Sequence, residues 1–339
     1  MKSKHLFTLA LFCLLIGLPA LAQNSSTTKQ DASNYRLSGP YTHKNLTVFL
    51  VHGKDLTTKP FLTLQEALAQ KKVRVYETKD VNELAIRNLS NQDIYVQAGD
   101  IVRGGDQDRM ISVDFIVPPR SGRMPIAAFC VESGRWSKRG NEENASFTSS
   151  ENSATNALRL AAVDNKAPQQ AVWDNVVKVQ ADLAQNVGGN VNSTMSASSM
   201  ELSMEDSKVK ETSAAYINTL GGLLRNRSDV IGYVLAINGK VTSADVYSSH
   251  ALFAKLWPKL LKSNTVEAIA ELNDAAHKPV TSDTVQEFIA ESEKATAATK
   301  EVTPRVRMVT REDDKNIFSE TQDRQQKDGY VHRNYMRKQ

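Results

Sequence analysis

Residues 98–136 have the sequence AGDIVRGGDQDRMISVDFIVPPRSGRMPIAAFCVESGRW. Two short apolar runs, 115–117 and 125–131, combine aromatic, branched and small side chains in the way that is typical of buried strands. Charged side chains are concentrated beside these runs, at 103–109 and 132–136. The stretch therefore predicts short strands whose ends carry a dense group of charges.

The chain before this stretch continues the pattern of strands. Similar runs over 46–51, 73–75, 84–86 and 94–96 indicate that residues 45–136 are mostly sheet. A helix is expected near 60–68, between the first two of these runs.

The chain after it adds helices and further strands. Apolar residues at helical spacing predict three helices, over about 168–186, 209–224 and 250–270, and a peripheral helix near 282–294. The dipeptide Asn238-Gly239 predicts a hairpin between two apolar runs, and two or three closing strands are expected in the tail. The expected fold class is α+β, with one mixed or antiparallel sheet flanked by three or four helices.

The N-terminal sequence predicts export. Lys2 and Lys4 precede an apolar run at 6–18, and Ala20-Leu21-Ala22 offers small residues for cleavage. The expected organisation is a signal peptide at 1–22, a flexible leader at 23–43 and one α+β domain at 44–339. An exposed polar insertion is expected near 137–166. The mature protein is predicted to be periplasmic or secreted, with no transmembrane segment after signal cleavage.

Charge and cysteine content restrict the classes of partner. The formal net charge of +4 falls to +2 when Lys2 and Lys4 leave with the signal peptide, which argues against nucleic acid as the main partner. Cys130 is then the one remaining cysteine, so no disulfide is expected within the mature chain. The histidines show no metal-ligand spacing, and neither a metal nor a cofactor is predicted.

The candidate site is a polar pocket for a small anionic ligand, because arginine forks paired with carboxylates also hold phosphates and carboxylates. Its expected residues are Asp106, Gln107, Arg109, Glu132 and Arg135. The competing interpretation is a buried network that ties two strand ends together.

An enzymatic alternative also stays open, although no catalytic residue can be assigned. A hydrolase or transferase would use Glu132 or Asp106 as acid and base, or Cys130 as nucleophile with His52 or His250 as base. An oligomerising scaffold is a third possibility, and the oligomeric state is not predicted.

Two blocks of sequence resemble a known family. The turn Gly105-Asp106-Gln107-Asp108-Arg109 and the run from Pro125 to Trp136 are similar to those of a bacterial domain family of unknown function. Its usual name refers to ADP-ribosylglycohydrolases and rhodanese-phosphatases. The segment 251–263 resembles the family's C-terminal pattern. The resemblance implies a domain over roughly residue 44 to the C-terminal end and a site at the first two blocks, but no established activity.

Overall fold

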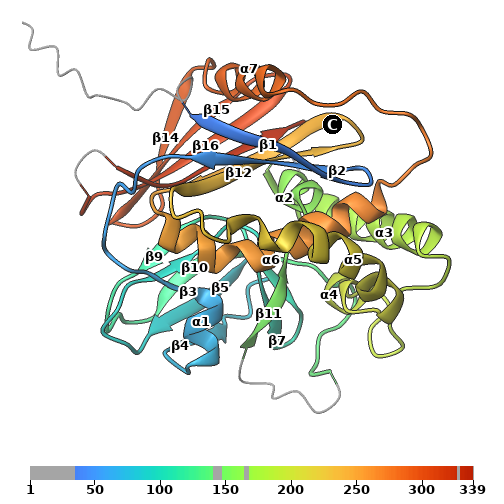
Figure 1. Ribbon diagram of the computed structural model, residues 1–339. Helices are drawn as coiled ribbons and strands as arrows, with labels where there is room; N and C mark the ends of the chain where they lie inside the picture. Colours follow the sequence, from blue (N-terminus) through green and yellow to red (C-terminus); the bar gives the residue numbers. More distant parts are fainter. Residues whose placement is uncertain (1–34, 140–146, 164–167, 327–328, 339) are drawn as a thin grey trace, which may run out of the picture. The chain divides into compact units, whose positions relative to one another are not determined.

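An eight-stranded antiparallel sheet organises the computed structural model, which describes residues 35–139, 147–163, 168–326 and 329–338. Within these residues contacts join the chain into one unit. The sheet has the strand order β1-β2-β12-β13-β17-β16-β15-β14 (Figure 1). Its strands are β1 (Arg36–His43), β2 (Leu46–His52), β12 (Val230–Ile237), β13 (Lys240–Tyr247), β14 (Ala297–Glu301), β15 (Val306–Glu312), β16 (Asn316–Asp323) and β17 (Tyr330–Arg337).

Both faces of the sheet are covered at β2 and β12, where alternate residues point to opposite faces and pack in different cores. Val48 and Leu50 of β2 pack in the core that includes α6 (His250–Ala270). Phe49 and Val51 pack in a second core with α7 (Ser282–Ser292). This burial explains why β2 and β12 are nearly continuous apolar runs.

Two smaller sheets contain the motif strands. One has the order β11-β7-β8-β10-β5-β4 and the other β3-β6-β9, in which β3 and β6 are parallel. Helix α6 packs against β12 and β13 of the large sheet and also against β11 and β3 (Figure 1). The remaining strands are β3 (Leu62–Thr63), β4 (Val73–Glu77), β5 (Glu83–Asn88), β6 (Ile94–Val96), β7 (Asp100–Gly104), β8 (Arg109–Ile111), β9 (Phe115–Val117), β10 (Met124–Cys130) and β11 (Phe147–Ser153).

The α+β class is confirmed, but the counts of sheets and helices are wrong. The described residues form three sheets and seven α-helices instead of one sheet and three or four helices. The additional helices are short, so their apolar spacing spans too few turns to stand out. Besides α6 and α7 the helices are α1 (Leu64–Ala69), α2 (Asn156–Val163), α3 (Pro168–Asn186), α4 (Met200–Met204) and α5 (Ser207–Leu220). None of the helices in the described residues is long and apolar enough to cross a membrane.

Two boundaries expected from composition also differ. The expected leader extended to residue 43, whereas β1 begins at Arg36 and pairs with β2. The expected exposed insertion at 137–166 contains β11 and α2, which are largely buried. Their polar groups are buried because distant side chains bind them: Ser150 donates to Glu201, and Asn156 N–H donates to Glu267. The predicted signal peptide lies outside the described residues.

Candidate functional site

The two sequence motifs meet where β8 pairs with β10. Cys130 lies opposite Arg109 in this antiparallel register. The pairing brings the turn before β8 beside the segment after β10, so that Asp108 N–H donates to Glu132 Oε2 at 3.2 Å. Arg135 Nη1 donates to the Gly105 carbonyl at 3.1 Å. The motifs are thus joined by hydrogen bonds between their polar groups.

Glu132 and Arg135 belong to a buried ion network that has two further members. Arg135 Nε lies 2.7 Å from Glu132 Oε1, and Arg139 Nη1 lies 2.9 Å from Asp108 Oδ2. Burial raises the pKa of Asp108 despite Arg139. For Glu132 the effect of burial is outweighed, chiefly by the hydrogen bond from Arg135, so its pKa lies below its ordinary value. Asp108 and Arg139 were not among the expected site residues, although Arg139 follows Arg135 by four positions.

The other three expected residues do not join this network through their side chains. Arg109 is buried and pairs with Glu77, with Nη2 lying 3.3 Å from Oε2. The backbone N–H of Asp106 donates to Glu77 Oε1 at 3.0 Å. Gln107 is fully buried, and neither of its amide atoms has a hydrogen-bond partner among the described residues. The expected pocket is therefore divided into an Arg109–Glu77 pair and the network of Glu132, Arg135, Asp108 and Arg139.

Cys130 has the environment of a buried structural thiol. Its Sγ lies 3.8 Å from the Val81 carbonyl oxygen, and burial raises its pKa to about 11. His52 contacts Ser38, and His250 Nδ1 lies 2.7 Å from the Val230 carbonyl oxygen. The two histidines considered as its base thus contact other groups, and the thiol is protonated at neutral pH.

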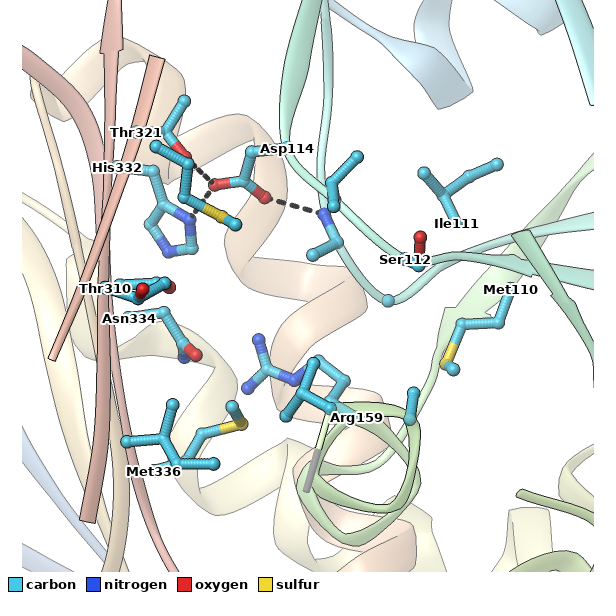
Figure 2. A pocket seen from close by; sticks show the side chains of 18 of the residues that line it. Met110, Ile111, Ser112, Asp114, Arg159, Thr310, Thr321, His332, Asn334 and Met336 are labelled. Carbon is cyan, nitrogen blue, oxygen red and sulfur yellow. Dashed lines mark hydrogen bonds and ion pairs between the residues drawn. The ribbon is translucent and has the colours of Figure 1, made fainter. Parts of the chain in front are cut away.

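A cavity of about 210 Å³ lies elsewhere, between α2, the segment 110–114 and strands β15, β16 and β17 (Figure 2). None of the five expected site residues lines it. The polar side chains on its wall include Asp114, Arg159, Thr321, His332 and Asn334.

His332 is held between two buried carboxylates at this cavity. Its Nδ1 lies 2.6 Å from Asp114 Oδ2, and its Nε2 lies 3.0 Å from Asp245 Oδ1. Burial acts to lower the pKa of His332, but Asp114 and Asp245 outweigh it and raise the pKa to about 9. For Asp114 and Asp245 burial acts in the opposite direction and is again outweighed, so both pKa values lie below the ordinary range. His332 is therefore an imidazolium at neutral pH.

Arg159 supplies a second buried cation, and its guanidinium extends toward Asn334 and Met336 across the cavity (Figure 2). The side chain comes from α2 and is 8 % exposed. Its Nη1 lies 3.3 Å from Asp245 Oδ1 and its Nη2 lies 3.4 Å from Asn156 Oδ1. Its Nε is buried and has no hydrogen-bond partner among the described residues. Arg159 therefore has long contacts and one unused donor.

The rest of the cavity wall is mainly apolar. Met110, Met308 and Met336 place three thioether side chains on it, together with Ile317 and Ala162. Methionine is flexible and polarisable, and its sulfur makes favourable contacts with aromatic rings. The cavity thus combines a buried cation with an adaptable apolar surface.

A second, wider cavity of about 970 Å³ lies near α3 and the hairpin between β12 and β13. Its most buried charge is Glu267, which accepts hydrogen bonds from Asn156 N–H and Ala157 N–H and so binds the first turn of α2. Lys178 on its wall pairs with Asp182. The charges of Glu267 and Lys178 thus take part in contacts within the fold. In the parts of the chain that the structure describes, no group of three or more His, Cys, Asp or Glu is arranged to hold a metal ion.

The signal for the 210 Å³ cavity is present in the sequence but is indirect. Arg159 stands between Leu158 and Leu160 in an apolar helix. His332 directly follows the apolar pair Tyr330 and Val331 in a predicted strand. Buried positions of this kind carry a charge only when a partner or a ligand compensates it. Pairing between residues so far apart in sequence cannot be read from local patterns.

Comparison with known proteins identifies one relationship. The model of the ARG and Rhodanese-Phosphatase-superfamily-associated Protein domain, ARPP-1, matches residues 34–336. No curated protein and no solved structure matches the chain.

Proposed function

This chain belongs to the ARPP-1 domain family, and we propose that it is a binding domain for a small organic acid held beside Arg159. The observation that carries the proposal is the buried guanidinium that extends into a cavity with an unused Nε donor. A buried polar group without a partner costs free energy, and a ligand that supplies an acceptor removes that cost.

Arg159 pairs with Asp245, and its unused Nε donor favours a ligand group that accepts hydrogen bonds. Asp245 accepts from His332, Asn334 and Tyr233 at 3.0, 2.8 and 2.6 Å, whereas its contact with Arg159 is longer at 3.3 Å. Asp245 thus has three shorter contacts besides its ion pair with Arg159. A planar guanidinium binds a carboxylate through two parallel hydrogen bonds. The ligand group that fits this position is a carboxylate or a similar planar anion.

The apolar part of the cavity wall selects the rest of the ligand. Met110, Met308 and Met336 offer an apolar and adaptable surface. A cavity of about 210 Å³ is small compared with ordinary drug-sized sites. We therefore expect a single aromatic or branched aliphatic group joined to the acid.

Export is part of the same proposal. The charged and apolar pattern of residues 1–22 supports a binding module that acts in the periplasm or outside the cell. The buried pairs of Arg135, Arg139 and Arg109 support a structural role for the motif cluster at the ends of β8 and β10. ADP-ribose is included among the probes below, because the chain resembles a family whose usual name refers to ADP-ribosylglycohydrolases.

The test compares acids with their neutral amides by thermal shift. The probes are benzoate, phenylacetate and hexanoate, the three corresponding amides, and ADP-ribose. A ligand at 100 times its dissociation constant adds about 2.7 kcal/mol to the free energy of unfolding, so a binding acid raises Tm by a few degrees. The proposal expects this rise for at least one acid and for none of the amides.

Variants then place the binding site. Arg159→Met should abolish the rise, and Arg159→Lys should retain part of it while keeping the charge. Arg87→Met removes an exposed arginine and should leave the rise unchanged. Equal shifts for an acid and its amide, or an acid response that persists in Arg159→Met, would contradict the proposal. If ADP-ribose alone raises Tm and Arg159→Met abolishes that rise, the binding site is the one proposed but its ligand is not a small organic acid.

A further inference from the structure

A serine, a histidine and an aspartate meet at one end of the edge strand β1, away from the cavity beside Arg159. Arg36 lies opposite His52 in the pairing of β1 with β2, and the register shifts between Ser38 and Tyr41. Such bulges redirect side chains and are frequent next to active sites. The third residue, Asp229, immediately precedes β12, the other neighbour of β2.

The three side chains contact one another in the order of a nucleophile, a base and an orienting acid. Ser38 Oγ lies 2.7 Å from His52 Nε2, and Asp229 Oδ2 lies 3.1 Å from His52 Nδ1. The second contact meets the distance of an ion pair but not the direction of a hydrogen bond. Catalytic contacts are often loose in this way before substrate binds.

The exposure of the group suits a reaction at the surface. His52 is 8 % exposed, whereas Ser38 is partly exposed and the Asp229 side chain is 49 % exposed. The close contact with His52 and the charge of Arg36 hold the pKa of Asp229 below its ordinary value. The imidazole is thus buried beside a serine that is partly exposed.

Tyr41 contacts both the serine and an arginine. Tyr41 Oη donates a hydrogen bond to Ser38 Oγ at 3.4 Å, and the Arg227 guanidinium lies 5.0 Å from the centre of the Tyr41 ring. The Nη1 atom of Arg227 is buried without a hydrogen-bond partner among the described residues. An unpaired donor of this kind can stabilise an oxygen that becomes negatively charged during a reaction.

We propose that Ser38, His52 and Asp229 form a serine-hydrolase site for small carboxylic esters, with Arg227 stabilising the oxyanion. Ser38 Oγ attacks the ester carbonyl carbon, the carbonyl electron pair moves to oxygen, and His52 Nε2 takes the hydroxyl proton. The bond from carbon to the leaving oxygen then breaks, and the leaving alcohol receives that proton. Water attacks the acyl-serine with His52 as base, which releases the acid and returns a proton to Ser38.

The roles within this site are distinct. Ser38 and His52 are catalytic residues because they touch the reacting atoms, whereas Asp229 is a positioning residue that acts through His52. The proposal does not depend on the acid-binding cavity, because neither Ser38 nor His52 lines it.

Covalent labelling tests the proposal without any variant. The folded protein is treated with a fluorophosphonate at pH 8, digested, and analysed by mass spectrometry. We expect a single phosphonylated residue, Ser38, and loss of the reaction when the protein is first unfolded in urea. A folded protein that carries no adduct on Ser38, under conditions that label a known serine hydrolase, would overturn the proposal.

Variants separate catalysis from stability. Ser38→Ala and His52→Gln should reduce hydrolysis of 4-nitrophenyl acetate about 100-fold or more, while Ser137→Ala, at an exposed serine, should not. Asp229→Asn should lower the rate of labelling and change its pH dependence, which a purely structural role would not do. Labelling of Ser38 is measured without any acid present, so failure of the acid-binding proposal is distinguishable from failure of this one. Equal hydrolysis by the parent and Ser38→Ala would overturn the proposal. The Ser38–His52 contact would then serve only to stabilise the pairing of β1 with β2.

Discussion

Protonation of His332 should control the pH dependence of stability between about pH 6.5 and 9. The ordinary pKa of 6.5 applies in the unfolded chain, and the pKa in the folded protein is about 9 because Asp114 and Asp245 outweigh the effect of burial. Between these values the folded state binds one more proton than the unfolded state. The stabilisation is therefore complete below pH 6.5 and is lost as the pH rises through about 9.

The magnitude follows from the gap between the two pKa values. One pH unit corresponds to about 1.4 kcal/mol, so the complete effect is roughly 3 kcal/mol. In the middle of the window the folded state binds about one more proton than the unfolded state. The free energy of unfolding should therefore fall by about 1.4 kcal/mol per pH unit there. Such a change is a large fraction of the stability of an ordinary domain.

Urea denaturation at half-unit steps from pH 6 to 10 measures this slope. His332→Gln keeps hydrogen-bonding capacity but removes the cation, so its profile should be flat in the upper part of the window, above the pKa of about 7 of Glu201 and Glu267. At pH 7 it should be less stable than the parent by about 3 kcal/mol, because two buried carboxylates lose a partner. His277→Gln removes an exposed histidine and should leave the parent profile unchanged. A flat parent profile, or the same slope in His332→Gln, would refute the reasoning.

Three other predictions concern buried groups outside the cavity. Arg139→Met leaves the carboxylates of Asp108 and Glu132 with one cation fewer and should cost about 3 kcal/mol in urea denaturation; a cost below about 1 kcal/mol would match an exposed ion pair instead. Cys130, whose pKa burial raises to about 11, should resist iodoacetamide at pH 7.5 until the protein unfolds, and rapid native labelling would contradict this. Burial raises the pKa of Glu201 to about 7, so folding takes up a proton between pH 4.5 and 7 and ionised Glu201 destabilises the protein above that range. Glu201→Gln should therefore raise Tm at pH 8, and a lower Tm would show that its contacts with neighbouring groups prevail.

The sequence predicts those parts of the fold whose signal is local. The hairpin at Asn238-Gly239 is confirmed, with both residues at positive φ between β12 and β13. The long helix expected over 250–270 is found as His250–Ala270, with Ser249 accepting a hydrogen bond from Leu252 N–H. Both depend on neighbours within a few residues, which is why patterns of sequence reveal them.

The missed features depend on partners that are distant in the chain. The polar strand β11 and the first turn of α2 become buried because Glu201 and Glu267 bind their polar groups. In the candidate site, the meeting of Glu132 with the turn before β8 follows from two nearby motifs. The cavity does not follow from local motifs, because Arg159 pairs with the carboxylate of Asp245, which is far along the chain. Local sequence shows that such a charge is unusual but not what compensates it.

The order of strands in the large sheet has a consequence for how the chain reaches its native state. β2 ends at His52 and its partner β12 begins at Val230, while β17, late in the sequence, lies between β13 and β16 near the middle of the sheet. A ribosome must therefore release almost the whole chain before all strands of the sheet can pair. Long-range pairing of this kind slows folding, because the entropy of closing a long loop is lost before the contacts form. The unpaired strand edges meanwhile make the nascent chain a substrate for chaperones, and loss of β17 alone would leave two half-sheets with exposed edges at β13 and β16.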